Sequence, residues 1–196
     1  MPKVDEEHRT QRRDQILDAA LARFAERGFQ STSMADIFEA SGLSAGAVYS
    51  YFKSKQELAI AVARRAVSAQ ISGMSADLDA GRVPSPGGLL RAITDGIRRQ
   101  GVPTPLILQL WGEAGTDPEF RAITTEVFAA LGAGFRAYLE RWAVQSGRAD
   151  AASAAAWAEA AVPVMLALGQ GYIVQSAIAD GFDADRYFAG VERILG

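Results

Sequence analysis

Apolar residues recur at helical spacing along most of the 196-residue chain, and glycine, proline or capping residues interrupt them at intervals. The first such stripe runs from Ile16 to Phe24 and stops at Gly28. The pattern predicts an all-helical fold of about nine helices without strands. After the first helix we expect the others at about 34–40, 45–51, 54–80, 89–99, 105–114, 118–146, 150–179 and 183–195.

Capping residues fix several of these starts. Ser33 precedes an acid at the third helical position, Asp36, which resembles a capping box, and Ser44 and Ser54 stand where two further helices begin. Asp117 before a proline predicts another start. We expect two domains, an N-terminal three-helix domain over 1–56 and a helical C-terminal domain over 57–196, with 81–88 as a turn.

Composition excludes most catalytic chemistry. The chain has no cysteine and a single histidine, His8, so thiolate zinc sites, disulfides and two-histidine metal sites are ruled out. We therefore expect no enzyme, no metal and no cofactor. The charged start, residues 1–13, reads as a polar tail without a secretory signal, and no segment has the roughly 18 uninterrupted apolar residues of a membrane helix. These features predict a soluble, cytoplasmic protein.

Net charge is −3 for the whole chain, which argues against a protein that coats nucleic acid. The charge is unevenly distributed. Residues 1–65 carry ten basic and nine acidic side chains, net +1, and residues 66–196 carry ten and fourteen, net −4. The asymmetry suggests two functional regions, although chance clustering on solvated faces gives the same pattern.

The segment from Gly28 to Leu58 holds the candidate functional residues. Two short helices joined through Gly42 make a helix-turn-helix whose small core we assign to Ile37, Leu43 and Val48. The second helix starts with small residues, which would let it enter a major groove. Two short helices packed at a similar angle also occur in helical proteins without a DNA partner. The candidate contacts are Ser33, Ser44, Ala45, Gly46, Tyr49, Tyr51, Lys53 and Lys55, and we assign Phe52 to the core.

The run from Gly42 to Phe52, with Gly28-Phe29, Thr32-Ser33, Asp36-Ile37 and the segment 53–58, resembles the TetR/AcrR family of helix-turn-helix transcriptional regulators. Residues 111–114 followed by 117–119 and Arg121 resemble a pattern of that family's ligand domain. The resemblance implies a homodimer, a palindromic double-stranded operator and a small-molecule pocket in the C-terminal domain.

Carried over by position, Ser33, Ser44, Tyr49 and Lys55 match the family's phosphate or backbone contacts. Ala45, Gly46 and Tyr51 match positions that face the bases or the groove wall. One residue departs from the pattern: Phe38 stands where the family usually has alanine, so the two short helices must pack differently there. Three arginines of the polar tail could add DNA contacts, or the tail could be solvated and disordered: Arg9, Arg12 and Arg13.

The two long helices at 118–146 and 150–179 are apolar on more than one face, which predicts that they form a four-helix bundle with a second copy of the chain. Burial within one chain is the alternative. Pro163 lies inside the second helix and could kink it and open a cavity, or only curve it. We expect a mostly apolar pocket lined by Met74, Ile93, Gln109, Trp111, Glu113, Phe128, Met165 and Gln170.

Together these patterns predict a ligand-responsive, DNA-binding transcriptional regulator, a repressor that a small apolar effector releases from its operator. Two alternatives stay open. One is a helical ligand-binding protein that keeps the fold without DNA binding. The other is an enzyme on a helical scaffold with Glu113 or Asp117 as acid or base.

Overall fold

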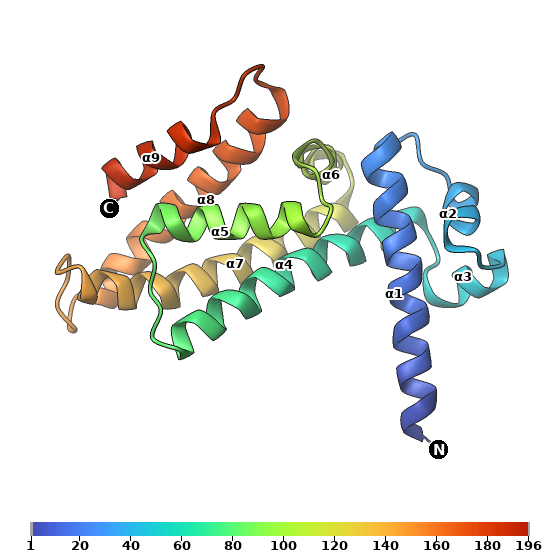
Figure 1. The fold of residues 1–196 in the computed structure, drawn as a ribbon, viewed down its shortest axis with the longest axis horizontal. Helices are drawn as coiled ribbons and strands as arrows, with labels where there is room; N and C mark the ends of the chain where they lie inside the picture. Colours follow the sequence, from blue (N-terminus) through green and yellow to red (C-terminus); the bar gives the residue numbers. More distant parts are fainter. Residues whose placement is uncertain (1, 196) are drawn as a thin grey trace.

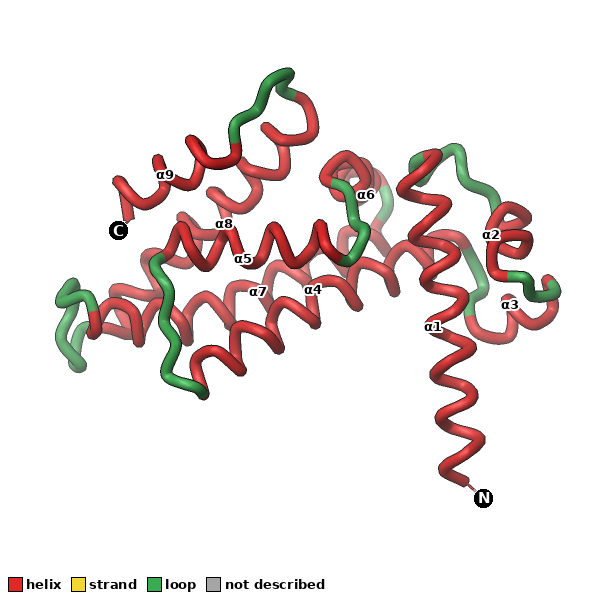
Figure 2. Tube along the Cα trace, in the orientation of Figure 1, coloured by secondary structure: helices red, strands yellow, loops and turns green. Residues whose placement is uncertain are grey.

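The computed structural model describes residues 2–195, with side chains from residue 6, and these residues form nine helices and no strand (Figures 1 and 2). The prediction of an all-helical fold is confirmed. The helices are α1 Pro2–Arg27, α2 Met34–Ser41, α3 Ala45–Tyr51, α4 Lys55–Asp79, α5 Pro86–Arg99, α6 Thr104–Thr116, α7 Pro118–Gln145, α8 Ala154–Ile178 and α9 Ala184–Leu195.

The predicted caps explain the observed helix starts. The Ser44 and Ser54 side chains accept hydrogen bonds from the backbone N–H groups of Ala47 and Glu57, at 3.2 and 3.0 Å. Asp117 accepts from the N–H of Glu119 at 2.8 Å, directly before the proline that begins α7. Each cap satisfies an N–H that the helix leaves unpaired.

Three predicted starts need correction. The first helix reaches back to Pro2, so residues 2–13 are helical rather than a polar tail. Helix α5 begins at Pro86 instead of residue 89, because Ser85 caps it and accepts from Gly88 N–H at 3.3 Å. Helix α8 begins at Ala154 instead of 150, because the Asp150 carboxylate accepts from the N–H and hydroxyl of Ser153 and holds a separate turn.

The helices pack around two cores. The first unites the N-terminal helices with the adjacent parts of α4, α6 and α7, and it includes Phe24, Phe29, Leu58 and Phe120. The second lies among α4, α5, α7, α8 and α9 and includes Tyr138, Met165 and Phe188. The predicted domain boundary at 56/57 falls within the first turn of α4. The first core crosses that boundary, which ties the two regions mechanically.

In Figure 1, α4, α5 and α7 run along the long axis, and α1 crosses one end of this layer with α2 and α3 beyond it. Helix α6 lies between the layer and α1. Arg65 of α4 holds α1 through Asp18 at 2.7 Å, and Arg64 holds α7 through Glu126 at 2.6 Å. Helix α4 is therefore the element that joins the three-helix region to the rest.

Helix α8 is long and apolar enough to cross a membrane by length and composition, although the core helix of a soluble protein passes the same test. Only 11% of its most apolar stretch is buried in the single chain. Its outward side includes Val164 and Ile178, which are 43% and 68% exposed. A large part of this apolar helix is thus uncovered.

Candidate nucleic-acid interface and ligand cavity

The helix-turn-helix has the predicted small core. Ile37 and Val48 are fully buried, and Leu43 packs partly buried against them. Gly42 ends α2 with φ = 67°, a left-handed conformation that glycine adopts without strain. This turn sets α3 across the end of α2 with one side toward solvent.

The exposed side of α3 begins with small residues. Ser44, Ala45 and Gly46 are all exposed, and no atom outside the local backbone lies within 4 Å of where a Gly46 Cβ would stand. The start of α3 is therefore narrow and unobstructed, and a neighbouring molecule can approach its backbone closely.

Tyr49 stands on the same exposed side, 41% exposed, and its ring packs edge-to-face on Phe38 with centroids 5.4 Å apart. This contact accounts for the departure from the family pattern at Phe38. The larger ring lies half-buried at the edge of the first core and packs against Tyr49.

The other predicted contacts lie in different surroundings. Tyr51 is half-buried against the first core. The Lys53 ammonium donates to the Tyr49 carbonyl at 2.6 Å and is exposed. The Lys55 ammonium donates to the carbonyls of Phe29 and Gln30, at 2.8 and 3.1 Å, and lies 4.6 Å from the centre of the Phe29 ring. Lys55 thus fastens the loop after α1.

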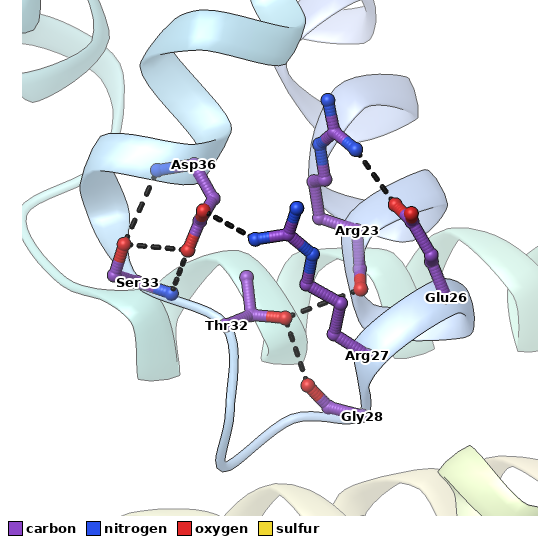
Figure 3. A network of polar contacts seen from close by, with 7 residues as sticks. All are labelled: Arg23, Glu26, Arg27, Gly28, Thr32, Ser33 and Asp36. Atoms are coloured by element: carbon purple, nitrogen blue, oxygen red, sulfur yellow. Dashed lines mark hydrogen bonds and ion pairs between the residues drawn. The ribbon is translucent and has the colours of Figure 1, made fainter.

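Ser33 and Asp36 form a complete capping box (Figure 3). The Ser33 hydroxyl accepts from Asp36 N–H at 3.2 Å and donates to the Asp36 carboxylate at 2.6 Å, which also accepts from Ser33 N–H at 2.8 Å. Arg27 adds an ion pair at 2.7 Å. These hydrogen bonds, followed by the charge of Arg27, hold the Asp36 pKa below its ordinary value.

Helix α1 brings two arginines beside α3. Arg9 and Arg12 line a surface hollow of about 450 Å³ together with Leu43, Ala47 and Tyr51. Because α1 is helical here, these side chains project from a defined backbone next to α3. The alternative of a disordered tail is therefore wrong, and the DNA contacts of these arginines stay a prediction.

A mostly apolar cavity of about 120 Å³ lies among α4, α6 and α7, and α5, the α5–α6 loop and α8 contribute one residue each. Trp111 of α6 and Phe128 of α7 meet at its wall, with ring centroids 5.8 Å apart. Its other lining residues include Val62, Ala63, Ala66, Leu110, Ile123 and Thr124. Helix α8 reaches the cavity through Ile173, so the cavity does not open at Pro163.

The structure does not bring the eight predicted ligand residues together. Trp111 and Phe128 line the cavity, but Met74, Ile93 and Met165 are buried in the second core, farther along their helices. Gln170 is half-buried and outside the lining. The apolar positions of α4 that do line it share the helical spacing of core positions, so the sequence alone could not separate wall from core.

Gln109 and Glu113, the other two predicted ligand residues, instead face the N-terminal region. The Gln109 amide oxygen accepts from the N–H of Phe29 at 2.8 Å, and Glu113 accepts from the Gln30 side chain. Asp117, the other acid considered for catalysis, caps α7. Helix α6 therefore carries cavity residues on one side and holds the loop after α1 with the other.

Residues 16–62 match the family model described as bacterial regulatory proteins, tetR family. An uncharacterised HTH-type transcriptional regulator of Bacillus subtilis, YfiR, is 47% identical over 57 residues, 29% of this chain and 28% of that protein. The HTH-type transcriptional repressor Rv1474c of Mycobacterium tuberculosis is 44% identical over 64 residues, 33% and 34% of the two chains. The chain thus matches about a third of the length of these relatives.

The similarity in structure to known proteins extends over nearly the whole chain. The solved structure of Salmonella enterica GusR has a TM-score of 0.69 and 25% identity, covering 94% of this chain and 95% of that one. The chain is a helix-turn-helix protein with an all-helical C-terminal region. Its residues 16–62 match the tetR family model, in agreement with the resemblance that its motifs indicated. The matched relatives are named as regulators, not as enzymes.

Proposed function

We propose that this protein is a ligand-responsive, DNA-binding transcriptional repressor that a small, mostly apolar effector releases from a palindromic operator. The observation that carries the proposal is an exposed recognition helix joined, through α4, to an apolar cavity. The resemblance of residues 16–62 to regulators supports it. We assign DNA binding to 1–56 and effector binding with dimerisation to 57–196, in the cytoplasm.

The exposed side of α3 reads the groove. Ala45 and Gly46 offer little more than backbone and methyl contact, while Tyr49 offers a hydroxyl group. Ser44 and Lys53 meet phosphates, and Arg9 and Arg12 add positive charge beside them. Ser33, Tyr51 and Lys55 lie at the rim of this surface, where their internal contacts also hold its shape.

A second copy of the chain covers the apolar outer side of α8 and the adjoining α7. Burying an exposed apolar helix against its symmetry mate is the usual arrangement of two-fold dimers, and it would remove Val164 and Ile178 from water. The dimer presents two α3 helices. Both fit one side of a duplex when their separation matches one helical turn, about 34 Å.

The effector acts through α4 and α6. Residues 59–67 of α4 supply much of the cavity wall, and only three residues separate the end of α3 from the start of this helix. Gln109 of α6 holds the loop after α1 at 2.8 Å. A molecule that fits the cavity better in one arrangement of these helices shifts the separation of the two α3 helices and so lowers DNA affinity.

A gel-shift with DNA flanking the protein's own gene tests the proposal. We expect a shifted complex that weakens steeply as salt rises, because Lys and Arg release counterions from phosphates. Tyr49→Ala should weaken it while Arg99→Gln, far from α3 and exposed, should not. Equal binding by wild type and Tyr49→Ala would contradict the contact surface assigned to α3. Absence of binding to any fragment would instead favour a helical ligand-binding protein without DNA binding.

A further inference from the structure

A second cavity adjoins the first and has a different character. It has a volume of about 290 Å³ and lies among α5, α6, α8 and the loop between α5 and α6. Four apolar side chains line both cavities and form the partition between them: Ile97, Val102, Ile107 and Ile173. The two spaces are therefore neighbours, and a ligand that displaces one of these side chains would occupy both.

The two compartments differ in chemistry. The inner one is walled by aliphatic and aromatic side chains, with the Thr124 hydroxyl as an exception. The outer one has polar side chains around its wall, namely Thr94, Arg98, Thr104, Tyr172 and Ser176. Arg98 is the one charged side chain among the described residues that line it.

Arg98 lies where it can meet a ligand at the mouth. Its side chain is 77% exposed, so the outer compartment opens to water there. It pairs with Asp95 one helical turn earlier at 3.1 Å, a contact of modest strength at such exposure. A ligand anion can therefore share or replace Asp95 at small cost, whereas a cation there would meet the repulsion of Arg98.

We propose that the two compartments together bind an amphipathic anion, with its apolar chain in the inner cavity and its anionic head group in the outer one beside Arg98. This inference rests on the proposed function for its regulatory meaning, but the binding itself does not. It narrows the effector from a mostly apolar molecule to one with a charged end, because Arg98 places a positive charge at the outer wall that a wholly apolar ligand would not use.

Octanoate and 1-octanol, which share their chain length and differ in charge, test the head-group assignment by calorimetric titration of the full chain. We expect octanoate to bind more tightly than octanol. Arg98→Gln should weaken octanoate about fivefold and leave octanol unchanged. Asp95→Asn should tighten octanoate, since it frees Arg98. Arg99→Gln removes the same charge from the next residue, outside the lining, and should change neither ligand.

Ala63→Leu, which places a larger side chain in the inner cavity, should weaken the binding of both ligands. This variant tests whether the apolar chain of the ligand lies in that cavity. Circular dichroism verifies that each variant is folded. Equal binding of octanol and octanoate, or equal effects of Arg98→Gln and Arg99→Gln, would overturn the inference. Arg98-dependent octanoate binding without any change in DNA affinity would instead refute the proposed regulation and leave the binding site standing.

Discussion

Lys53 and Lys55 stand two residues apart, in the loop after α3 and at the first position of α4, yet they make different contacts. Lys53 is exposed and makes one local hydrogen bond to the Tyr49 carbonyl. Lys55 bonds two carbonyls of the loop after α1 and covers the Phe29 ring. A residue matched by position to a DNA contact can thus also support the domain.

This difference predicts separable effects on stability. Lys55→Ala should lower the free energy of unfolding by about 1–2 kcal/mol, because it removes hydrogen bonds from two carbonyls and a cation–π contact. Lys53→Ala should lower it by less than about 0.5 kcal/mol. Urea unfolding followed by circular dichroism measures both values. Equal losses in the two variants would show that the Lys55 contacts contribute nothing specific.

The capping box predicts a pH dependence. The Asp36 pKa is below its ordinary value in the folded protein, so ionised Asp36 favours the folded state. Its contribution is therefore complete above about pH 4, the ordinary range of an aspartate, and is lost as the pH falls through the lower folded value. Asp36→Asn should reduce the urea midpoint at pH 7, and its difference from wild type should shrink below pH 4. A constant difference would contradict this.

Among the elements, α6 links the cavity to the N-terminal region. Leu106, Leu110 and Trp111 line the cavity, while Gln109 and Glu113 contact the loop after α1. Any ligand that displaces α6 must therefore move or strain this loop, whose residues also contact Lys55.

The Gln109 contact can be observed directly. Gln109→Ala removes the acceptor of the Phe29 N–H, so hydrogen exchange at that amide should become at least about tenfold faster. Gln175→Ala, at an exposed position of α8, serves as the control and should leave it unchanged. Unchanged protection of the Phe29 amide in Gln109→Ala would mean that another part of the structure holds this loop.

The same elements show how far the sequence predicts the structure. Local signals work well: Ser33, Ser44 and Ser54 cap helices, and Gly42 makes the turn, because these effects involve neighbouring residues only. The Gln109–Phe29 contact joins residues eighty positions apart and has no periodic signature. The cavity is equally hidden, because helical spacing identifies the side of a helix that is buried and not where neighbouring helices fail to touch.

At the scale of the whole molecule, the unequal charge distribution agrees with two surfaces of different character at the two ends. The near-neutral N-terminal region carries the basic hollow of Arg9 and Arg12, while the apolar, weakly buried α8 dominates the other end. A net charge of −3 therefore does not oppose site-specific DNA binding. A dimer needs only two small contact surfaces.

The dimer proposal predicts that a charge on the outer side of α8 separates the chains. Val164→Lys should sediment as a monomer at concentrations where the wild type is a dimer, because the ammonium would be buried without a partner. Ile194→Lys, at another exposed apolar position that lies on α9, should remain dimeric. A dimer in both variants would place the interface elsewhere.

Selection of binding sites from a random duplex library tests the central claim most directly. The account predicts that the wild-type protein enriches an inverted repeat with half-site centres about one helical turn apart, bound by two chains. It also predicts that Tyr49→Ala, folded and dimeric, enriches none. Failure of the folded wild-type dimer to enrich any sequence, or enrichment of the same repeat by Tyr49→Ala, would contradict it.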